Sequence, residues 1–277
     1  MKVLISCPVE VCGRLYAYVV CNSDEQESDV LNYISEVYTK IWNEVLICGN
    51  FDLNCVALGD APNSLFLSLE KLYHLQDLDA VYSTDSIRLS NLMQLRYSAL
   101  LPKVACEIIT IPSTNYDYCF ENAHSHIPKF NTIALGGTFD RLHNGHKKLL
   151  MLSASACSKR LIIGIMSDKL LQKKANSNLI TNFDTRKLKV EEFLNIFAKN
   201  ITTEIVQLDD PCGPTISEPD IDAIVVSSET IPGATKINEI RVNKGFLPLK
   251  VLVTSRNDVA TLSSTFIRDR LKGDASA

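Results

Sequence analysis

The chain has 277 residues, of which 46% are hydrophobic and 22% charged, a composition typical of a soluble globular protein and not of a disordered or membrane-embedded one. The charges sum to −4, so no chain-wide basic field exists to attract nucleic acid or a membrane surface, and neither is expected as a partner. Nine cysteines without a CxxC pair are typical of a reducing compartment, which predicts a cytoplasmic protein.

The N-terminal part, residues 1–115, is expected to be a separate domain, of α/β type, whose role the sequence does not indicate. Its only histidine, His74, stands alone among apolar neighbours and suggests no catalytic group. A proline-punctuated stretch without regular periodicity separates this part from the rest and is expected to be a linker. Apolar runs predict strands at 15–20, 3–6 and 45–48, and helical spacing predicts a helix at 29–42.

The C-terminal part, residues 128–277, shows strands that alternate with helices. The expected strands are 132–135, 161–166, 203–208, 221–226 and 249–253, and the expected helices are 145–157, one that Asp184 would cap and that runs through Phe197, 232–244 and 264–272. This order predicts an α/β fold with a doubly wound, Rossmann-like parallel sheet. In such a fold, ligands bind beyond the carboxyl ends of the strands.

The stretch with the most chemical information lies where the first strand of this domain leads to its first helix. It reads Gly136-Gly137-Thr138-Phe139-Asp140-Arg141-Leu142-His143-Asn144-Gly145-His146-Lys147. The two glycines let the backbone approach a ligand closely, and the free amides at a helix start favour an anion. His143 and His146 are three residues apart and are therefore expected on one helical face. The pattern indicates a phosphate site.

Chance and zinc are the alternative explanations of the two histidines. Five histidines and eleven glycines in 277 residues give roughly 0.004 expected chance occurrences of His-x-Gly-His, so coincidence is disfavoured. Neither a His-Glu-x-x-His string nor a nearby cysteine pair accompanies the histidines, which disfavours zinc, and no protein-held metal is predicted.

This string resembles the signature of the HxGH nucleotidylyltransferase superfamily, and in its long form it is similar to the eukaryotic and archaeal phosphopantetheine adenylyltransferase family. The resemblance covers about half of the chain and continues in collinear order at 167–171, 185–186, 210–215, 228–230, 237–241 and 263–268. It implies an adenylyl transfer from ATP to 4′-phosphopantetheine, which gives dephospho-coenzyme A and pyrophosphate by direct in-line attack.

The resemblance also implies the site residues. His143 and His146 would stabilise the charge that develops on the ATP phosphates, with His146 the better defined of the two. The substrate-binding residues would be Gly137, Thr138, Phe139, Lys174 and Arg241, with Lys173 as a catalytic cation. The nucleotide-binding residues would be His146, Ser228, Glu229, Ser263, Ser264, Thr265 and Arg268.

Several of these assignments keep a plainer alternative. The phosphate-neutralising lysine is Lys169, Lys173 or Lys174, and the alternative is a solvated basic loop. For Arg241 the alternative is a surface arginine on a helix. Asp140 and Asp210 are expected to organise turns and helix starts and not to act as acids or bases.

The expected cofactor is Mg²⁺, carried by the phosphates of ATP, because the motif contains no carboxylate cluster. The expected partners are the small molecules ATP and 4′-phosphopantetheine, together with other enzymes of coenzyme A synthesis. No Walker A string occurs, so the kinase step of that pathway is assigned to another protein.

Two other functions remain open. The first is another enzyme of the superfamily, either a cytidylyltransferase or a nicotinamide mononucleotide adenylyltransferase. Cytidylyltransferases carry Arg-Thr-x-Gly-Ile-Ser-Thr before the last helix, whereas this chain has Asp-Val-Ala-Thr-Leu-Ser-Ser at 258–264, which disfavours cytidine. The second is a nucleotide-binding scaffold without catalysis, against which the intact His143, His146, Thr138 and Arg268 argue.

Overall fold

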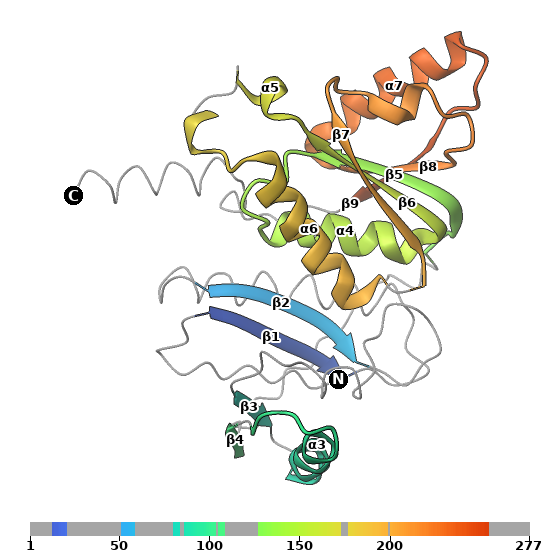
Figure 1. Cartoon of the computed structure of the whole chain (residues 1–277). Coiled ribbons are helices and arrows are strands. Elements are labelled where there is room, and N and C mark those ends of the chain that lie inside the picture. Colours follow the sequence, from blue (N-terminus) through green and yellow to red (C-terminus); the bar gives the residue numbers. More distant parts are fainter. Residues whose placement is uncertain are drawn as a thin grey trace. The chain divides into compact units, whose positions relative to one another are not determined.

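The chain divides into two compact units, Met1–His126 and Ile127–Ala277 (Figure 1). The computed structural model describes residues 13–20, 51–58, 80–83, 86–103, 105–108, 127–172, 177–198 and 200–254. Among these residues, no helix combines the length and the apolar character that crossing a membrane requires.

The described residues of the first unit form two pairs of parallel strands and one helix. β1 (Gly13–Val20) pairs with β2 (Phe51–Leu58), and β3 (Ala80–Ser83) pairs with β4 (Ala105–Ile108). Helix α3 spans Ser86–Ser98. The strand predicted at 15–20 is confirmed within β1, whereas β2 to β4 and α3 were not predicted. The predictions at 3–6, 29–42 and 45–48 lie outside the described residues.

The second unit is built on a five-stranded parallel sheet in the order β7-β6-β5-β8-β9. The strands are β5 (Phe130–Gly137), β6 (Cys157–Met166), β7 (Thr202–Leu208), β8 (Ala223–Ser227) and β9 (Lys250–Thr254). The first strand of the unit therefore lies in the middle, and the chain winds outwards from it in both directions. This confirms the predicted doubly wound fold, and all five strands fall at the predicted places.

Helices cover both faces of this sheet. α4 (Asn144–Ala156) and α6 (Phe183–Phe197) lie on one face, and α7 (Ile231–Asn243) lies on the other (Figure 1). The short elements are α5 (Asp168–Leu171) and the 3₁₀ turns η1 (Ser177–Leu179), η2 (Gly213–Ile216) and η3 (Ser228–Thr230). The predicted cap of α6 is wrong by two residues: Asn182 accepts a hydrogen bond from the Thr185 amide at 2.9 Å, and Asp184 lies in the first turn.

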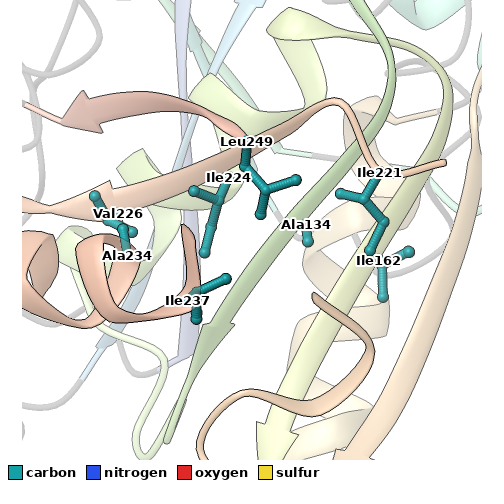
Figure 2. Packing of buried hydrophobic residues seen from close by; sticks show 8 residues of the cluster. All are labelled: Ala134, Ile162, Ile221, Ile224, Val226, Ala234, Ile237 and Leu249. Carbon is teal, nitrogen blue, oxygen red and sulfur yellow. The ribbon is translucent and has the colours of Figure 1, made fainter. Parts of the chain in front are cut away.

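Successive side chains of a strand point to opposite faces of the sheet, and in the central strands consecutive residues are apolar, so both faces of the sheet are apolar. On β5, Ile133 and Leu135 are buried on one side and Ala134 on the other. Figure 2 shows the cluster to which Ala134 belongs, where residues from the strands meet α7. Its members are Ala134, Ile162, Ile221, Ile224, Val226, Ala234, Ile237 and Leu249.

Two glycines make room for Leu208, the last residue of β7. A Cβ atom on Gly164 would lie 2.7 Å from a methyl group of Leu208, and one on Gly213 would lie 2.3 Å from the other methyl group. Gly213 also has a φ of +48°, a conformation that costs an L-residue about 1–2 kcal/mol. The turn after β7 therefore depends on glycine at position 213.

We expect Gly213→Ala to lower the free energy of unfolding by about 1–3 kcal/mol, because it combines the backbone strain with contact against Leu208. Urea unfolding measures this. Gly233→Ala in α7 is the matched control, since nothing lies within 4 Å of the added methyl group, and it should stabilise the chain by up to about 1 kcal/mol. Equal effects of the two substitutions would contradict this account of the turn.

Candidate functional site

A strained turn follows the carboxyl end of β5. Phe139 and Arg141 have φ angles of +53° and +48°, the left-handed region that residues other than glycine seldom occupy. The Phe139 ring is completely buried, and a Cβ atom on Gly137 would lie 3.1 Å from it. Glycine at position 137 therefore lets the ring fold back against the strand end. Strain of this kind tends to gather at functional sites.

Asp140 holds this turn in place. Its carboxylate is completely buried, and its Oδ1 accepts hydrogen bonds from the amide and the hydroxyl of Thr181 at 3.1 and 3.0 Å. The carboxylate thus ties the turn after β5 to the segment before α6. The prediction that Asp140 organises the structure is confirmed.

The two histidines of the motif stack on each other at the start of α4. Their ring centroids are 3.8 Å apart and their planes are inclined by 25°. The His146 ring also lies 5.1 Å from the Phe139 ring. His143 has extended backbone angles at the N-cap position, and its carbonyl accepts the Lys147 amide at 3.1 Å. The two rings come together as predicted, but His143 precedes the helix as its N-cap residue and does not lie on its first turn.

The start of α4 combines several features that favour an anion. The first amides of a helix have no partner within the helix, and its dipole places a partial positive charge there. The first turn of α4 carries no acidic side chain. Because imidazole can donate a hydrogen bond and gain a proton near neutral pH, His143 and His146 add two groups suited to phosphate.

The loops after the other strands reach the same edge of the sheet, since all five strands are parallel. After β7, Asp210 Oδ1 accepts the amides of Cys212 and Gly213 at 2.8 Å each, which confirms its predicted role in a turn. After β8, Ser228 and Glu229 lie exposed in η3. The edge therefore brings the glycine and histidine motif near exposed polar groups.

Comparison with known proteins shows which family the second unit resembles. The Cytidylyltransferase-like family matches residues 134–270. Phosphopantetheine adenylyltransferase from Methanosarcina acetivorans is 40% identical over 140 residues, which are 49% of this chain and 87% of the relative. The enzyme of the same name from Pyrobaculum aerophilum is 37% identical over 143 residues, 50% of this chain and 91% of the relative.

The chain belongs to the phosphopantetheine adenylyltransferase family. Phosphopantetheine adenylyltransferase from Saccharomyces cerevisiae is also similar, at 45% identity over 155 residues, 53% of this chain. That match spans about half of the yeast protein, 51% of its length. The enzymes of this family are nucleotidyltransferases, which agrees with the resemblance of the His143–His146 motif to the HxGH nucleotidylyltransferase signature.

Arg241 requires a correction. Its side chain is completely buried, and its five N–H groups donate to the carbonyls of Leu247, Thr215, Glu218, Pro219 and Ile221 at 2.6–3.3 Å. Burial lowers the pKa of this guanidinium. No donor is left for substrate, so Arg241 is an internal anchor of the fold, neither the expected substrate ligand nor a surface arginine.

Other expected site residues of this family member lie outside the described part of the chain: Lys173, Lys174, Ser263, Ser264, Thr265 and Arg268. Lys169 is described and is exposed in α5, at the carboxyl end of β6. Among the described residues, no group of three histidine, cysteine, aspartate or glutamate side chains is placed to hold a metal ion.

Arg186 is the residue whose position the sequence analysis did not interpret. It lies on α6 with only 1% of its surface exposed, and it donates hydrogen bonds to carbonyls at the ends of β5 and β6. A signal was present in the sequence. Arg186 precedes Val190 and Phe193 by four and seven residues and so occupies the apolar stripe of its helix, where an unpaired charge is costly.

We expect Arg241→Lys to lower the free energy of unfolding by about 2–4 kcal/mol, because lysine has three donors for the five carbonyls, two of them in fully buried bonds, and leaves some unsatisfied. Chemical denaturation of the variant and the parent chain measures this difference. Lys236→Arg, an exposed position on the same helix, is the control and should change stability by less than about 0.5 kcal/mol. A stable Arg241→Lys chain would show that the carbonyls find other donors.

Proposed function

We propose that this protein transfers the adenylyl group of ATP to 4′-phosphopantetheine and releases dephospho-coenzyme A and pyrophosphate. The observation that carries the proposal is the stacked His143–His146 pair at the start of α4, in a chain of the phosphopantetheine adenylyltransferase family. The strained turn at Phe139 and Arg141 supports it, because it presents a glycine-rich strand end beside the two rings.

The reaction joins two anions, so its main requirements are positioning and charge stabilisation. A phosphate oxygen of the acceptor forms a bond to the α-phosphorus of ATP while the bond to the bridging oxygen of pyrophosphate breaks. Negative charge grows on the non-bridging oxygens and on the leaving group. His143 and His146, together with the helix amides beside them, are suited to donate hydrogen bonds to that charge.

The acceptor phosphate would lie against the backbone of Gly137 to Phe139, with the hydroxyl of Thr138 near it. Support for this side comes from Gly137, the last residue of β5, because a residue without a side chain lets a ligand approach the backbone closely.

The remaining assignments come from the family resemblance and are part of the proposal. Lys173 or Lys174 would neutralise phosphate charge, and Ser228, Glu229, Ser263, Ser264, Thr265 and Arg268 would bind the nucleotide. Mg²⁺ would be carried by the ATP phosphates, because the described residues offer it no ligand cluster. The reaction is assigned to the cytoplasm, where ATP is available and where cysteines such as those of this chain remain reduced.

We expect His146→Ala to reduce kcat by about 100- to 1,000-fold, since it removes a donor to the charge that develops in the transition state. Release of pyrophosphate from Mg²⁺-ATP and 4′-phosphopantetheine measures the rate. His124→Ala, which removes a histidine outside residues 134–270, is the control and should keep the parent rate. If His146→Ala were folded and as fast as the parent chain, this histidine would have no part in catalysis.

Substrate choice is tested with parallel acceptors and nucleotides. The parent chain is expected to form dephospho-coenzyme A from ATP and 4′-phosphopantetheine, identified by product mass. Nicotinamide mononucleotide with ATP and phosphocholine with CTP are the controls for the other activities of the superfamily. Turnover with one of these controls alone would replace the proposed substrate, and ATP binding without any product would identify a binding protein.

A further inference from the structure

The guanidinium of Arg186 contacts every described loop at the carboxyl ends of β5 and β6. It is buried within the second unit and donates four hydrogen bonds: to the carbonyls of Thr181, Thr138 and Met166 at 2.8 Å each, and to Asp168 Oδ1 at 2.6 Å. One buried side chain with four partners therefore holds the residues after β5, the residues after β6 and the segment before α6 in fixed positions relative to one another.

The first contact joins two strand ends. Nη1 donates to the carbonyl of Thr138, directly after β5, and to the carbonyl of Met166, the last residue of β6. The β5–β6 ladder ends at the pair Gly137 and Ile165, so the guanidinium continues the connection one residue beyond the backbone hydrogen bonds. It thereby sets the distance between the Thr138 backbone and the start of the loop that carries Lys169.

The second contact reaches the histidine turn. Nε donates to the carbonyl of Thr181, and the amide and hydroxyl of Thr181 in turn donate to Asp140. Asp140 lies between the two left-handed residues Phe139 and Arg141. Phe139 packs against the His146 ring, so this chain of contacts runs from Arg186 to the histidine pair.

The third contact fixes the loop after β6 to the start of α6. Nη2 pairs with Asp168 at 2.6 Å, and the other oxygen of that carboxylate accepts the amide of Phe183 at 3.2 Å. The guanidinium is fully enclosed, whereas the Asp168 side chain is 58% exposed. The pair therefore lies at the boundary between the interior and the site edge, where Lys169 follows directly in sequence.

We propose that Arg186 is a positioning residue, which holds the Thr138 backbone, the loop after β6 and the histidine turn in the geometry that adenylyl transfer requires. Arg186 would not touch substrate, because its donors face protein carbonyls and Asp168. Its effect would come through the groups it holds. Displacing reacting groups by about 1 Å costs up to roughly 100-fold in rate, so a loss of this fastening would be visible in kcat.

Arg186→Lys is the decisive variant, since it keeps the charge and loses the planar fork that reaches four partners. We expect kcat to fall about 10- to 100-fold, while the KM values for ATP and 4′-phosphopantetheine change less than about threefold. Arg160→Lys is the matched control: Arg160 bonds to Glu204 and Glu218 at 2.9 and 2.7 Å, towards the other end of β6. Its kcat should stay within about twofold of the parent value.

Amide hydrogen exchange gives a readout that does not need turnover. Arg186→Lys should speed exchange of the peptides that cover 137–143 and 166–172 at least about tenfold, and Arg160→Lys should leave them unchanged. Thermal unfolding of each variant confirms that it is folded at the assay temperature. Asp168→Asn serves if Arg186→Lys does not fold, with an expected fall in kcat of about three- to tenfold and faster exchange of 166–172.

Because this inference rests on the proposed function, the outcomes separate the two. Parent activity with an unchanged kcat in Arg186→Lys, or in Asp168→Asn where that variant replaces it, would overturn the role of Arg186 and leave the proposed function standing. If the parent chain formed no dephospho-coenzyme A, the proposed function would be overturned. Hydrogen exchange would then test by itself whether Arg186 holds the loops after β5 and β6 in place. Unchanged exchange in the folded variant would overturn this role of Arg186 in either case.

Discussion

Everything in the candidate site depends on the pairing of β5 with a strand on each side. β5 pairs with β6 and with β8, and both ladders are parallel. Backbone hydrogen bonds hold the strand on both sides at Ile133–Leu135 and on the β6 side as far as Gly137, where the chain leaves the sheet at its carboxyl edge. Gly137, the strained turn and the start of α4 follow at that point, so a rigid strand fixes the place from which the histidines extend.

Two buried arginines then do what the sheet cannot. Backbone ladders hold strands side by side, but the loops beyond the strand ends have carbonyls that no neighbouring strand satisfies. Arg186 of α6 and Arg241 of α7 donate hydrogen bonds to such carbonyls. A guanidinium is suited to this role because five planar donors can satisfy several carbonyls at once, which offsets the cost of burying the charge.

The two arginines differ in what they hold. Arg241 contacts Leu247, which precedes β9, and the segment from Thr215 to Ile221, which precedes β8, so it holds the connections that lead into these two strands. Arg186 contacts the residues directly beside the histidine motif. A buried guanidinium thus serves stability in one place and the geometry of a proposed active site in the other, and the two differ in their partners: five carbonyls for Arg241, three carbonyls and the Asp168 carboxylate for Arg186.

The sequence by itself determined the type and order of the elements in the second unit. Short apolar runs that alternate with amphipathic stretches predict parallel strands joined by right-handed helical crossovers, which is the doubly wound sheet observed. The spacing of His143 and His146 predicted that their rings lie together at the start of α4. Local signals were weaker at the boundaries. Asn182 and Asp184 both suit a helix cap, and only the observed hydrogen bond to Thr185 shows which one caps α6.

The tertiary structure alone decided which groups the buried arginines bond. Helical spacing indicates that Arg186 faces inwards, but no local pattern shows whether a buried arginine contacts a phosphate or protein carbonyls, which is why Arg241 was predicted as a substrate ligand and Arg186 was not interpreted. Their partners are 5–48 residues away in the chain. Hydrogen-bond partners at such distances are set by how the strands and loops pack, and periodicity, which reports only on neighbouring residues, cannot show them.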